Sequence, residues 1–258
     1  MNILLDAGAR PVIGHRGNRA HAPENTIESF AQAVALGADA IEFDVHVSAD
    51  GIPVVHHDPT VARTTDGSGE ISRITFAELR RLDAGARFTP DGGKTWPFRG
   101  MGHRIPSLDE VFETLPSTPL LIEIKTPLAA TAVRASIETH GAEHRVLVDA
   151  TSSVALRAFS GSEIAAGASR ADVARLTAEI VLGRQVTPLT YRALCVPLSY
   201  YGIPVPVRRF AKIAPKYDCR VHVWTLNDPA VAADLWAAGV NGIISDDPAV
   251  MLKVRPTR

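Results

Sequence analysis

The chain has 258 residues, of which 46% are hydrophobic and 21% are charged. This composition is typical of globular proteins and excludes the disordered and fibrous classes. Its 27 Lys and Arg residues balance 28 Asp and Glu residues, and the net charge of -1 excludes broad electrostatic capture of nucleic acid or of an anionic membrane surface. The two cysteines, Cys195 and Cys219, lack metal-site spacing and are expected to be reduced thiols.

The N-terminal segment predicts no targeting signal, because it carries Asp6 and lacks a basic region followed by a sustained apolar run. No segment approaches the ~18 consecutive apolar residues that a membrane span needs. We therefore expect a cytoplasmic protein without a membrane span, although a chain trimmed of a signal peptide would look the same. Because no linker or internal repeat divides the sequence, residues 1–258 are expected to form a single domain.

Short β-rich runs alternate with helix-patterned runs along most of the chain, as in a parallel sheet built from strand and helix units. This order predicts the α/β class and a TIM-type (β/α)8 barrel. The candidate strands lie at residues 11–15, 40–46, 53–58, 120–125, 145–149, 163–167, 193–197, 220–225 and 241–245. A barrel needs eight strands, so one of these candidates must be extra.

Capping residues define the expected ends of several helices. Asn25 suits the N-cap of the first helix, Glu28 completes something close to a capping box, and Gly37 suits the left-handed position at the C-terminus. An acid followed by proline at 228–229 and again at 247–248 predicts the starts of the last two helices.

The extra strand is predicted to be 53–58, because Asp50-Gly51 between two extended runs is a strong hairpin signal. This strand would return antiparallel to its predecessor. A two-residue turn at Asp50-Gly51 would place His57 opposite Asp44.

Residues 60–105 are too long for a simple barrel connection and contain a Gly-Ser-Gly run at 67–69. We interpret the segment as an inserted cap, and the alternative is a mobile surface excursion with no part in catalysis. Its large apolar residues are expected to form a small core of their own or to line an apolar groove. These residues are Phe88, Trp96, Phe98 and Met101.

Glu42 and Asp44 are two residues apart in an apolar strand, so both side chains point to the same face. Two adjacent negative charges inside a barrel are costly unless a cation or a proton compensates them. A divalent metal is therefore the favoured explanation, and an exposed, solvated ribbon is the alternative.

Glu123 and Lys125 share a face of the later strand 120–125. On their own they are compatible with a structural ion pair. Together with Glu42 and Asp44, however, Glu123 supplies a third hard oxygen ligand, and oxygen-only sites favour Mg²⁺, Ca²⁺ or Mn²⁺ over zinc. Lys125 would then face an anion.

The first strand ends in His15, Arg16 and Gly17. A permanent cation beside a histidine that exchanges protons near neutral pH suits phosphodiester cleavage, although a loop histidine is often unremarkable. Trp224 at a strand end is either a core residue or a platform for a substrate group. His46 and His56 are expected to be supporting or solvated residues.

In this order the motifs resemble the glycerophosphodiester phosphodiesterase family from about Val12 to Pro248. The segment HRGNRAHAPENTIESFAQAVALGADAIEFDVHVSADGIPVVHHDPTVARTTDGSG resembles the opening signature of that family. IEIK at 122–125, VWTLN at 223–227 and GIISDDP at 242–248 resemble its later blocks. Residues 60–105 resemble its characteristic insertion, which favours the cap.

The resemblance implies an α/β-barrel enzyme that uses a divalent cation to cleave glycerophosphodiesters to glycerol 3-phosphate and an alcohol. Its implied partner is this small-molecule substrate, without nucleic acid, and no oligomeric state is implied. Matched residue by residue, the resemblance implies metal ligands, an acid-base pair and phosphate-contacting cations. These are Glu42, Asp44 and Glu123 for the metal, His15 and His57 for acid-base catalysis, and Arg16 and Lys125 for phosphate.

Two other functions remain open from the sequence. A related phosphodiesterase acting on lysophospholipids or phosphoinositol-type substrates would share the metal and the histidines. A non-catalytic phospho-ligand-binding protein would keep the cations but lose a ligand or a proton carrier, whereas every expected position is filled here.

Overall fold

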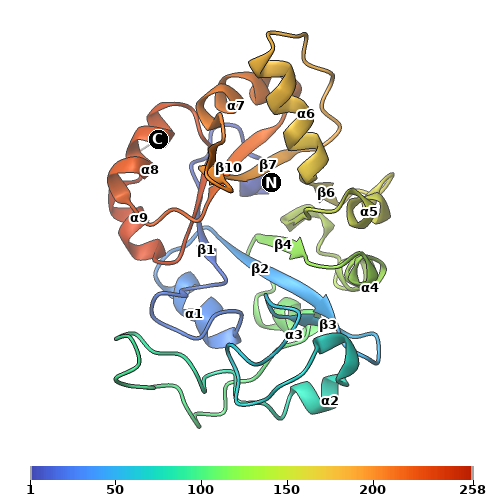
Figure 1. Cartoon of the computed structure of the whole chain (residues 1–258), viewed down its shortest axis with the longest axis vertical. Coiled ribbons are helices and arrows are strands. Elements are labelled where there is room, and N and C mark those ends of the chain that lie inside the picture. The colour runs from blue at the N-terminus through green and yellow to red at the C-terminus, as the bar shows by residue number, and fades with distance from the viewer. Residues whose placement is uncertain (1, 257–258) are drawn as a thin grey trace.

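Eight parallel strands form a nearly closed barrel in the computed structural model, which describes residues 2–256 (Figure 1). They follow the order β6-β5-β4-β2-β1-β11-β10-β7, and a parallel bridge between Gly167 and Ala193 links the two end strands. The barrel strands are β1 (Val12–His15), β2 (Ala40–Val47), β4 (Leu120–Ile124), β5 (Val146–Asp149), β6 (Ala165–Ala166), β7 (Ala193–Pro197), β10 (Arg220–Trp224) and β11 (Gly242–Ser245). The predicted TIM-type barrel is therefore confirmed.

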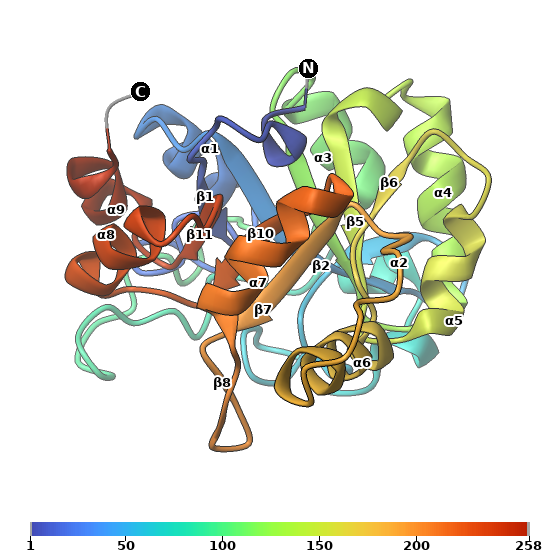
Figure 2. The same ribbon diagram turned by 90° about the horizontal axis from the view of Figure 1, so that it is seen from above.

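Helices surround the barrel on its outer side, as Figure 2 shows from above. They are α1 (Ile27–Ala35), α3 (Leu108–Thr114), α4 (Ala130–Thr139), α5 (Ser153–Leu156), α6 (Arg170–Val181), α7 (Val207–Ile213), α8 (Pro229–Ala237) and α9 (Pro248–Val254). The short helix α2 (Phe76–Leu79) lies apart from them, within residues 60–105. The acid and proline pairs at 228–229 and 247–248 begin α8 and α9 as predicted.

The start of α1 differs from the sequence prediction. Thr26 is the N-cap, since its side chain accepts from the backbone N–H of Ser29, and Asn25 precedes it with a left-handed φ of 58°. Asn25 is instead drawn toward β2, where its Nδ2 donates to Asp44 Oδ2 at 2.9 Å. The cap prediction failed because the Asn25 side chain has a stronger, charged partner on another element.

The ninth strand, β3 (Pro53–Val55), pairs antiparallel with β2 as predicted, but the register differs by one residue. The turn is a three-residue loop at 49–51 closed by hydrogen bonds between Ser48 and Ile52, with Gly51 at a φ of +84°. A left-handed glycine at the end of a three-residue loop is a common hairpin form. Asp44 consequently faces His56, not His57, and the His56 N–H donates to the Asp44 carbonyl oxygen.

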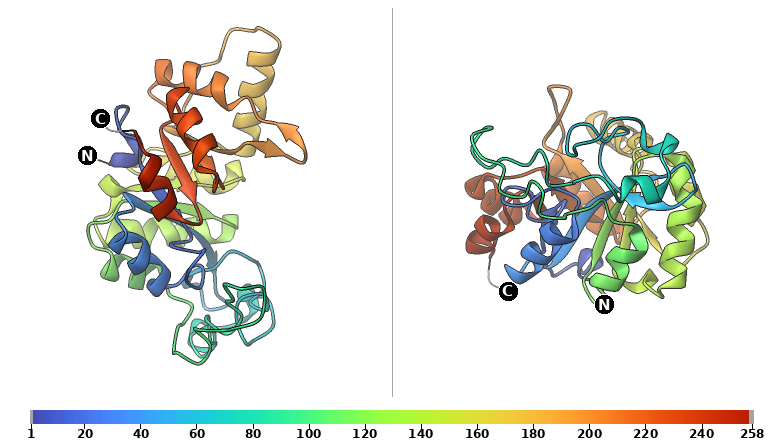
Figure 3. Two further views of the ribbon diagram at one scale, coloured as in Figure 1. Left: turned by 90° about the vertical axis from the view of Figure 1, so that its left-hand side faces the viewer. Right: turned by 90° about the horizontal axis from the view of Figure 1, so that it is seen from below.

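Residues 60–105 leave the barrel beside β3 and extend from one end of the molecule (Figure 3). Their core is formed with the hairpin by aliphatic residues that include Val54, Ile71 and Leu79. The predicted core of Phe88, Trp96, Phe98 and Met101 was wrong. Phe88 and Phe98 are half-buried against each other, whereas Trp96 and Met101 are exposed, because the smaller aliphatic residues fill the space next to β3.

The barrel interior changes from apolar to polar along its axis. Side chains alternate in each strand, so that Leu121 joins the inner apolar cluster and Ile122 packs in an outer one, while Glu123 falls on the same face as Leu121. Leu4 from the N-terminal segment belongs to the inner cluster and closes that end of the barrel. Polar residues therefore gather at the carboxyl ends of the strands, where sites on this fold form.

Candidate active site

Three carboxylates meet at the carboxyl ends of β2 and β4. Asp44 is directly paired with Glu123 in the parallel ladder. Glu42 lies two residues before Asp44 on β2 and therefore on the same face of the strand. Ligand oxygens from the three side chains all lie within 4.8 Å of one another. Glu42 and Asp44 are buried and Glu123 is half-buried, so the structure brings together the three residues that the sequence singled out as metal ligands.

Burial and mutual repulsion affect these carboxylates differently. The pKa of Glu42 is raised well above its ordinary value by burial, and the charges of Asp44 and Glu123 add to that effect. Burial also opposes ionisation of Asp44, but the positive charges of Arg16 and Lys125 outweigh it and lower the pKa of Asp44. The cluster thus has a carboxylate whose charge the surrounding protein does not compensate.

Arg16 and Lys125 supply the positive charge around the cluster. Arg16 Nε lies 3.1 Å from Asp44 Oδ2, and its Nη1 donates to Glu24 Oε1 at 2.7 Å. Lys125 Nζ lies 3.1 Å from Glu123 Oε1 and 3.3 Å from Asp44 Oδ1. Although burial works against both cations, the neighbouring carboxylates raise the pKa of each.

The backbone at Arg16 is also part of the site. Arg16 has a left-handed φ of 53°, and its N–H donates to Glu42 Oε2 at 3.0 Å. Gly17 follows with a φ of +89° and has no room for a Cβ, because the backbone of Ser29 in α1 lies against it. This pair of residues aims a backbone donor at Glu42, and such backbone conformations are concentrated at functional sites.

His15 and His57 have the same arrangement of partners. His15 Nδ1 lies 2.6 Å from Asp246 Oδ1, and His57 Nδ1 lies 2.6 Å from Asp58 Oδ1. In each ring a carboxylate therefore holds Nδ1 and leaves Nε2 available, and His15 Nε2 faces Glu42 Oε2 at 4.0 Å. His57 lies in the loop after β3, yet its charge still contributes to lowering the pKa of Asp44.

Asp58 and Asp246, the carboxylates that contact the two histidines, have lowered pKa values. Burial opposes ionisation of Asp58, but hydrogen bonds from Arg63 and His57 lower its pKa to about 2. Burial likewise opposes ionisation of Asp246, but His15 and Asn227 hold its pKa at about 2. Each carboxylate is therefore ionised at neutral pH and keeps a proton on Nδ1 of its histidine.

Sequence reasoning missed Asp246, Glu24 and the role of Asn25 toward Asp44. Asp246 directly follows β11, and its position at the carboxyl end of a barrel strand was the available signal. Asp149 was also missed, although it carries the same signal: it ends β5, and it pairs with Glu123 in the ladder. Burial and the nearby charge of Glu123 raise the pKa of Asp149 well above its ordinary value.

The other aromatic and histidine candidates are placed clearly. Trp224 at the end of β10 is 37% exposed, so it is not a core residue. His46 Nε2 lies 3.0 Å from the carbonyl oxygen of His57. His56 is buried, with Nδ1 3.0 Å from the Asp58 carbonyl oxygen. Both histidines support the loop that carries His57, as expected.

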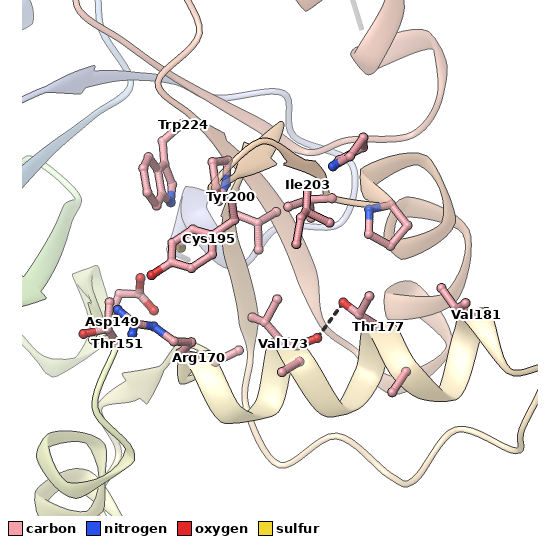
Figure 4. Close-up of a pocket in the computed structure, with 18 of the residues that line it drawn as sticks. Asp149, Thr151, Arg170, Val173, Thr177, Val181, Cys195, Tyr200, Ile203 and Trp224 are labelled. Atoms are coloured by element: carbon pink, nitrogen blue, oxygen red, sulfur yellow. Dashed lines mark hydrogen bonds between the residues drawn. The ribbon is translucent and has the colours of Figure 1, made fainter.

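A cavity of about 580 Å³ opens beside the carboxylate cluster. Glu123, Asp149 and Trp224 line one end of it, and it extends along α6 toward Val181 (Figure 4). Phe88, Trp96, Phe98 and Met101 of segment 60–105 do not line this cavity.

The carboxyl ends of the barrel strands thus hold oxygen ligands for a cation, positive charge for a phosphate and two histidines for proton transfer, which are the groups that phosphodiester cleavage needs. The model of the glycerophosphoryl diester phosphodiesterase family matches residues 15–250. The chain belongs to this family, which confirms the enzyme class predicted from the sequence.

Individual relatives agree with this assignment. The chain is 32% identical over 259 residues to a glycerophosphodiester phosphodiesterase from Caldanaerobacter subterraneus subsp. tengcongensis, an alignment that covers 94% of this chain and 96% of the relative. A phosphodiesterase from Oleispira antarctica, solved in complex with the product sn-glycerol-3-phosphate, is 28% identical with a TM-score of 0.76, and 95% of this chain and 96% of that one align.

The fold alone is also shared with the glycerophosphoryl diester phosphodiesterase domain of Rv2277c from Mycobacterium tuberculosis. The TM-score is 0.84 at 21% identity, and the match covers 96% of this chain and 100% of that one. None of the helices within residues 2–256 is long and apolar enough to cross a membrane.

Proposed function

We propose that this protein hydrolyses glycerophosphodiesters to glycerol 3-phosphate and an alcohol, with a divalent cation bound by Glu42, Asp44 and Glu123 and with His15 and His57 as the acid-base pair. The observation that carries the proposal is the convergence of three carboxylate ligand oxygens within 4.8 Å of one another. The Oleispira relative with bound glycerol 3-phosphate supports the substrate class.

The carboxylate cluster fits a hard divalent cation. Its donors are all oxygens, the ligand type that Mg²⁺, Ca²⁺ and Mn²⁺ prefer. A cation would also offset the repulsion that raises the pKa of Glu42. When bound, it supplies positive charge to a phosphate oxygen and lowers the pKa of an attacking hydroxyl group.

The histidines are suited to move protons at Nε2. Because Asp246 and Asp58 hold the two Nδ1 atoms, each ring presents Nε2 to the site in a fixed orientation. One Nε2 accepts the proton of the attacking hydroxyl group, and the other donates a proton to the oxygen of the departing alcohol. The orientation of the bound substrate determines which of His15 and His57 is the base and which is the acid.

Arg16, Lys125 and Trp224 are proposed to bind the substrate. Both cations are ion-paired with the carboxylate cluster, so they lie next to the proposed phosphate position and neutralise charge that develops there. Trp224 is exposed at the mouth of the cavity and offers a flat apolar surface to a substrate group.

We further propose that residues 60–105 form a cap within one phosphodiesterase domain of residues 1–258. The support is that the segment contacts the site: Arg63 donates to both Glu24 and Asp58, and Thr64 lies 3.0 Å from His56 Nε2. The cytoplasmic location remains a prediction from the sequence.

The first experiment is release of glycerol 3-phosphate from glycerophosphocholine and glycerophosphoethanolamine with Mg²⁺, Ca²⁺, Mn²⁺ or chelator. We expect release that depends on the metal and falls by roughly 10²–10⁴-fold in kcat in His15→Ala and in His57→Ala. His144→Ala, which removes an exposed histidine, is the matched control and should keep wild-type turnover. Near-full turnover in both active-site variants, or in chelator, would refute the proposed mechanism.

A further inference from the structure

The 580 Å³ cavity is larger than the proposed phosphodiester site requires, because most of its lining lies beyond the carboxylates, cations and histidines. It follows α6, which has 12 residues and is therefore about 18 Å long. The opposite wall is formed by the small hairpin of β8 (Ser199–Tyr200) and β9 (Ile203–Pro204). Figure 2 shows this hairpin projecting from the body of the molecule.

The cavity is continuous with the candidate active site. Glu123 lines it and is also a member of the carboxylate cluster. Asp149, Thr151 and Trp224 lie at the same end in Figure 4, whereas Val181 lies at the far end of α6. A molecule whose phosphodiester lies at the cluster would thus have the cavity next to it.

The walls beyond the active-site end are apolar. Val173, Val181 and Ile203 line the cavity, and Pro204, Val205 and Pro206 continue its apolar wall after Ile203. Thr177 also lines it, but its hydroxyl donates to the Val173 carbonyl oxygen at 2.7 Å (Figure 4). This part of the cavity therefore offers dispersion contacts and no free charged group to a ligand.

The outer rim of the cavity exposes large apolar side chains to water. Ile203 is 71% exposed, Val181 is 63% exposed and Leu182 is 61% exposed, and all three line the cavity. Adjacent apolar side chains that remain exposed on a folded protein commonly mark a binding site for an apolar ligand. Val181 and Leu182 lie at the C-terminal end of α6 and Ile203 lies on β9, so exposed apolar side chains border the cavity on both of its walls.

We propose that the preferred substrates carry one long aliphatic chain on the glycerol, as lysophospholipids do, and that this chain binds along α6 against the β8-β9 hairpin. The inference rests on the proposed phosphodiesterase function and names its substrate class. The apolar groove for the chain would thus be formed by α6 and the β8-β9 hairpin, and not by residues 60–105. In the reaction on a lysophosphatidylcholine, a P–O bond to water oxygen forms, the P–O bond to choline breaks, and choline leaves with a proton.

The test measures choline release from glycerophosphocholine and from lysophosphatidylcholines with acyl chains of increasing length, at concentrations below micelle formation. Each methylene that enters the apolar cavity should raise kcat/KM by up to about fourfold, until the cavity is filled. Choline release from the substrate without a chain tests the proposed function separately.

Tryptophan substitutions at two alanines of α6 test whether the chain binds on the face of the helix that lines the cavity. Ala178 lines the cavity, whereas Ala171 is exposed on the same helix and does not line it. Ala178→Trp should lower the ratio of kcat/KM for decanoyl-lysophosphatidylcholine to kcat/KM for glycerophosphocholine by about tenfold or more. Ala171→Trp should leave that ratio at the wild-type value.

Each other outcome overturns the inference. A kcat/KM that does not rise with chain length removes the apolar substrate class and leaves the proposed function intact if glycerophosphocholine is cleaved. An unchanged ratio in Ala178→Trp shows that the chain does not bind along α6. Failure to release choline from any of these substrates, by folded wild-type protein with metal, overturns both the inference and the proposed function.

Discussion

His15 and His57 come from different parts of the chain and have equivalent surroundings, each with a carboxylate on Nδ1. The carboxylate fixes the ring orientation and the tautomer, so the imidazole does not have to reorganise when a proton is transferred. Asp246 and Asp58 are accordingly positioning residues, which act through the histidines and not on the substrate.

The Asp246→Asn variant tests this positioning role. The amide keeps the shape of the side chain but no longer favours a proton on His15 Nδ1, so we expect kcat to fall by about 10- to 100-fold with a smaller change in KM. Steady-state kinetics of glycerol 3-phosphate release measures both constants. Asp234→Asn, at an exposed aspartate that pairs with Arg208, is the control, and an equal loss in both variants would contradict the assignment.

Burial and the charges of Asp44 and Glu123 raise the pKa of Glu42 well above its ordinary value. In the presence of chelator, Glu42→Gln should therefore raise the free energy of unfolding above that of wild type, because the amide does not ionise and removes the cost of burying an ionisable carboxyl group. Metal at about 100 times Kd should stabilise wild type by about 2.7 kcal/mol, and the variant by less. Urea unfolding with and without Mg²⁺ measures this, and equal stabilisation of both proteins would exclude Glu42 as a ligand.

At the scale of elements, the β2-β3 hairpin sets the position of His57. Its three-residue loop pairs Asp44 with His56, so His57 falls just after the end of β3, where Asp58 can hold its ring. A two-residue loop would have placed His57 in the strand. The left-handed conformation of Gly51 is what permits the longer loop.

Substitution of Gly51 tests the loop independently of the active site. No atom lies within 4 Å of a Cβ added at this position, so only the backbone strain matters. Gly51→Ala should lower the free energy of unfolding by about 1–2 kcal/mol, and Gly51→Asn by less, because asparagine tolerates the left-handed region. Chemical unfolding of the two variants provides the comparison, and an equal cost for both would mean that strain is not the cause.

At the scale of the whole molecule, the barrel interior is polar at the carboxyl ends of the strands and apolar toward their amino ends, where Leu4 closes the barrel. His222 is an exception in the apolar part, fully buried with Nε2 2.9 Å from the Leu4 carbonyl oxygen. Gly242 on the adjacent strand has no Cβ, which leaves room for the His222 ring. Burial lowers the pKa of His222 from an ordinary 6.5 to about 4.

This histidine should make the stability of the whole barrel depend on pH. Between pH 6.5 and 4 the unfolded chain binds a proton at His222 and the folded chain does not, so the free energy of unfolding falls as the pH falls. The full contribution is present above pH 6.5, and about 3 kcal/mol is lost by pH 4. Urea unfolding of wild type and His222→Gln from pH 8 to 4 tests this, and parallel curves would rule out His222 as the cause.

Local patterns were sufficient for much of the fold and of the site chemistry. The eight barrel strands, the antiparallel β3 and the starts of α8 and α9 follow from hydrophobic periodicity and capping residues, which act over a few positions. Glu42 and Asp44 on one face of β2 follow from the two-residue period of a strand.

Tertiary structure decided which distant residues became partners. Asp246 meets His15 across 231 positions because β1 and β11 are neighbours in the barrel, and no local pattern encodes that contact. The Asn25 side chain donates to Asp44 and does not cap α1, because folding brings this buried carboxylate within hydrogen-bond distance. The apolar cavity likewise exists only where α6 and the β8-β9 hairpin pack beside the strand ends, since a cavity is a property of assembled surfaces and not of any one segment.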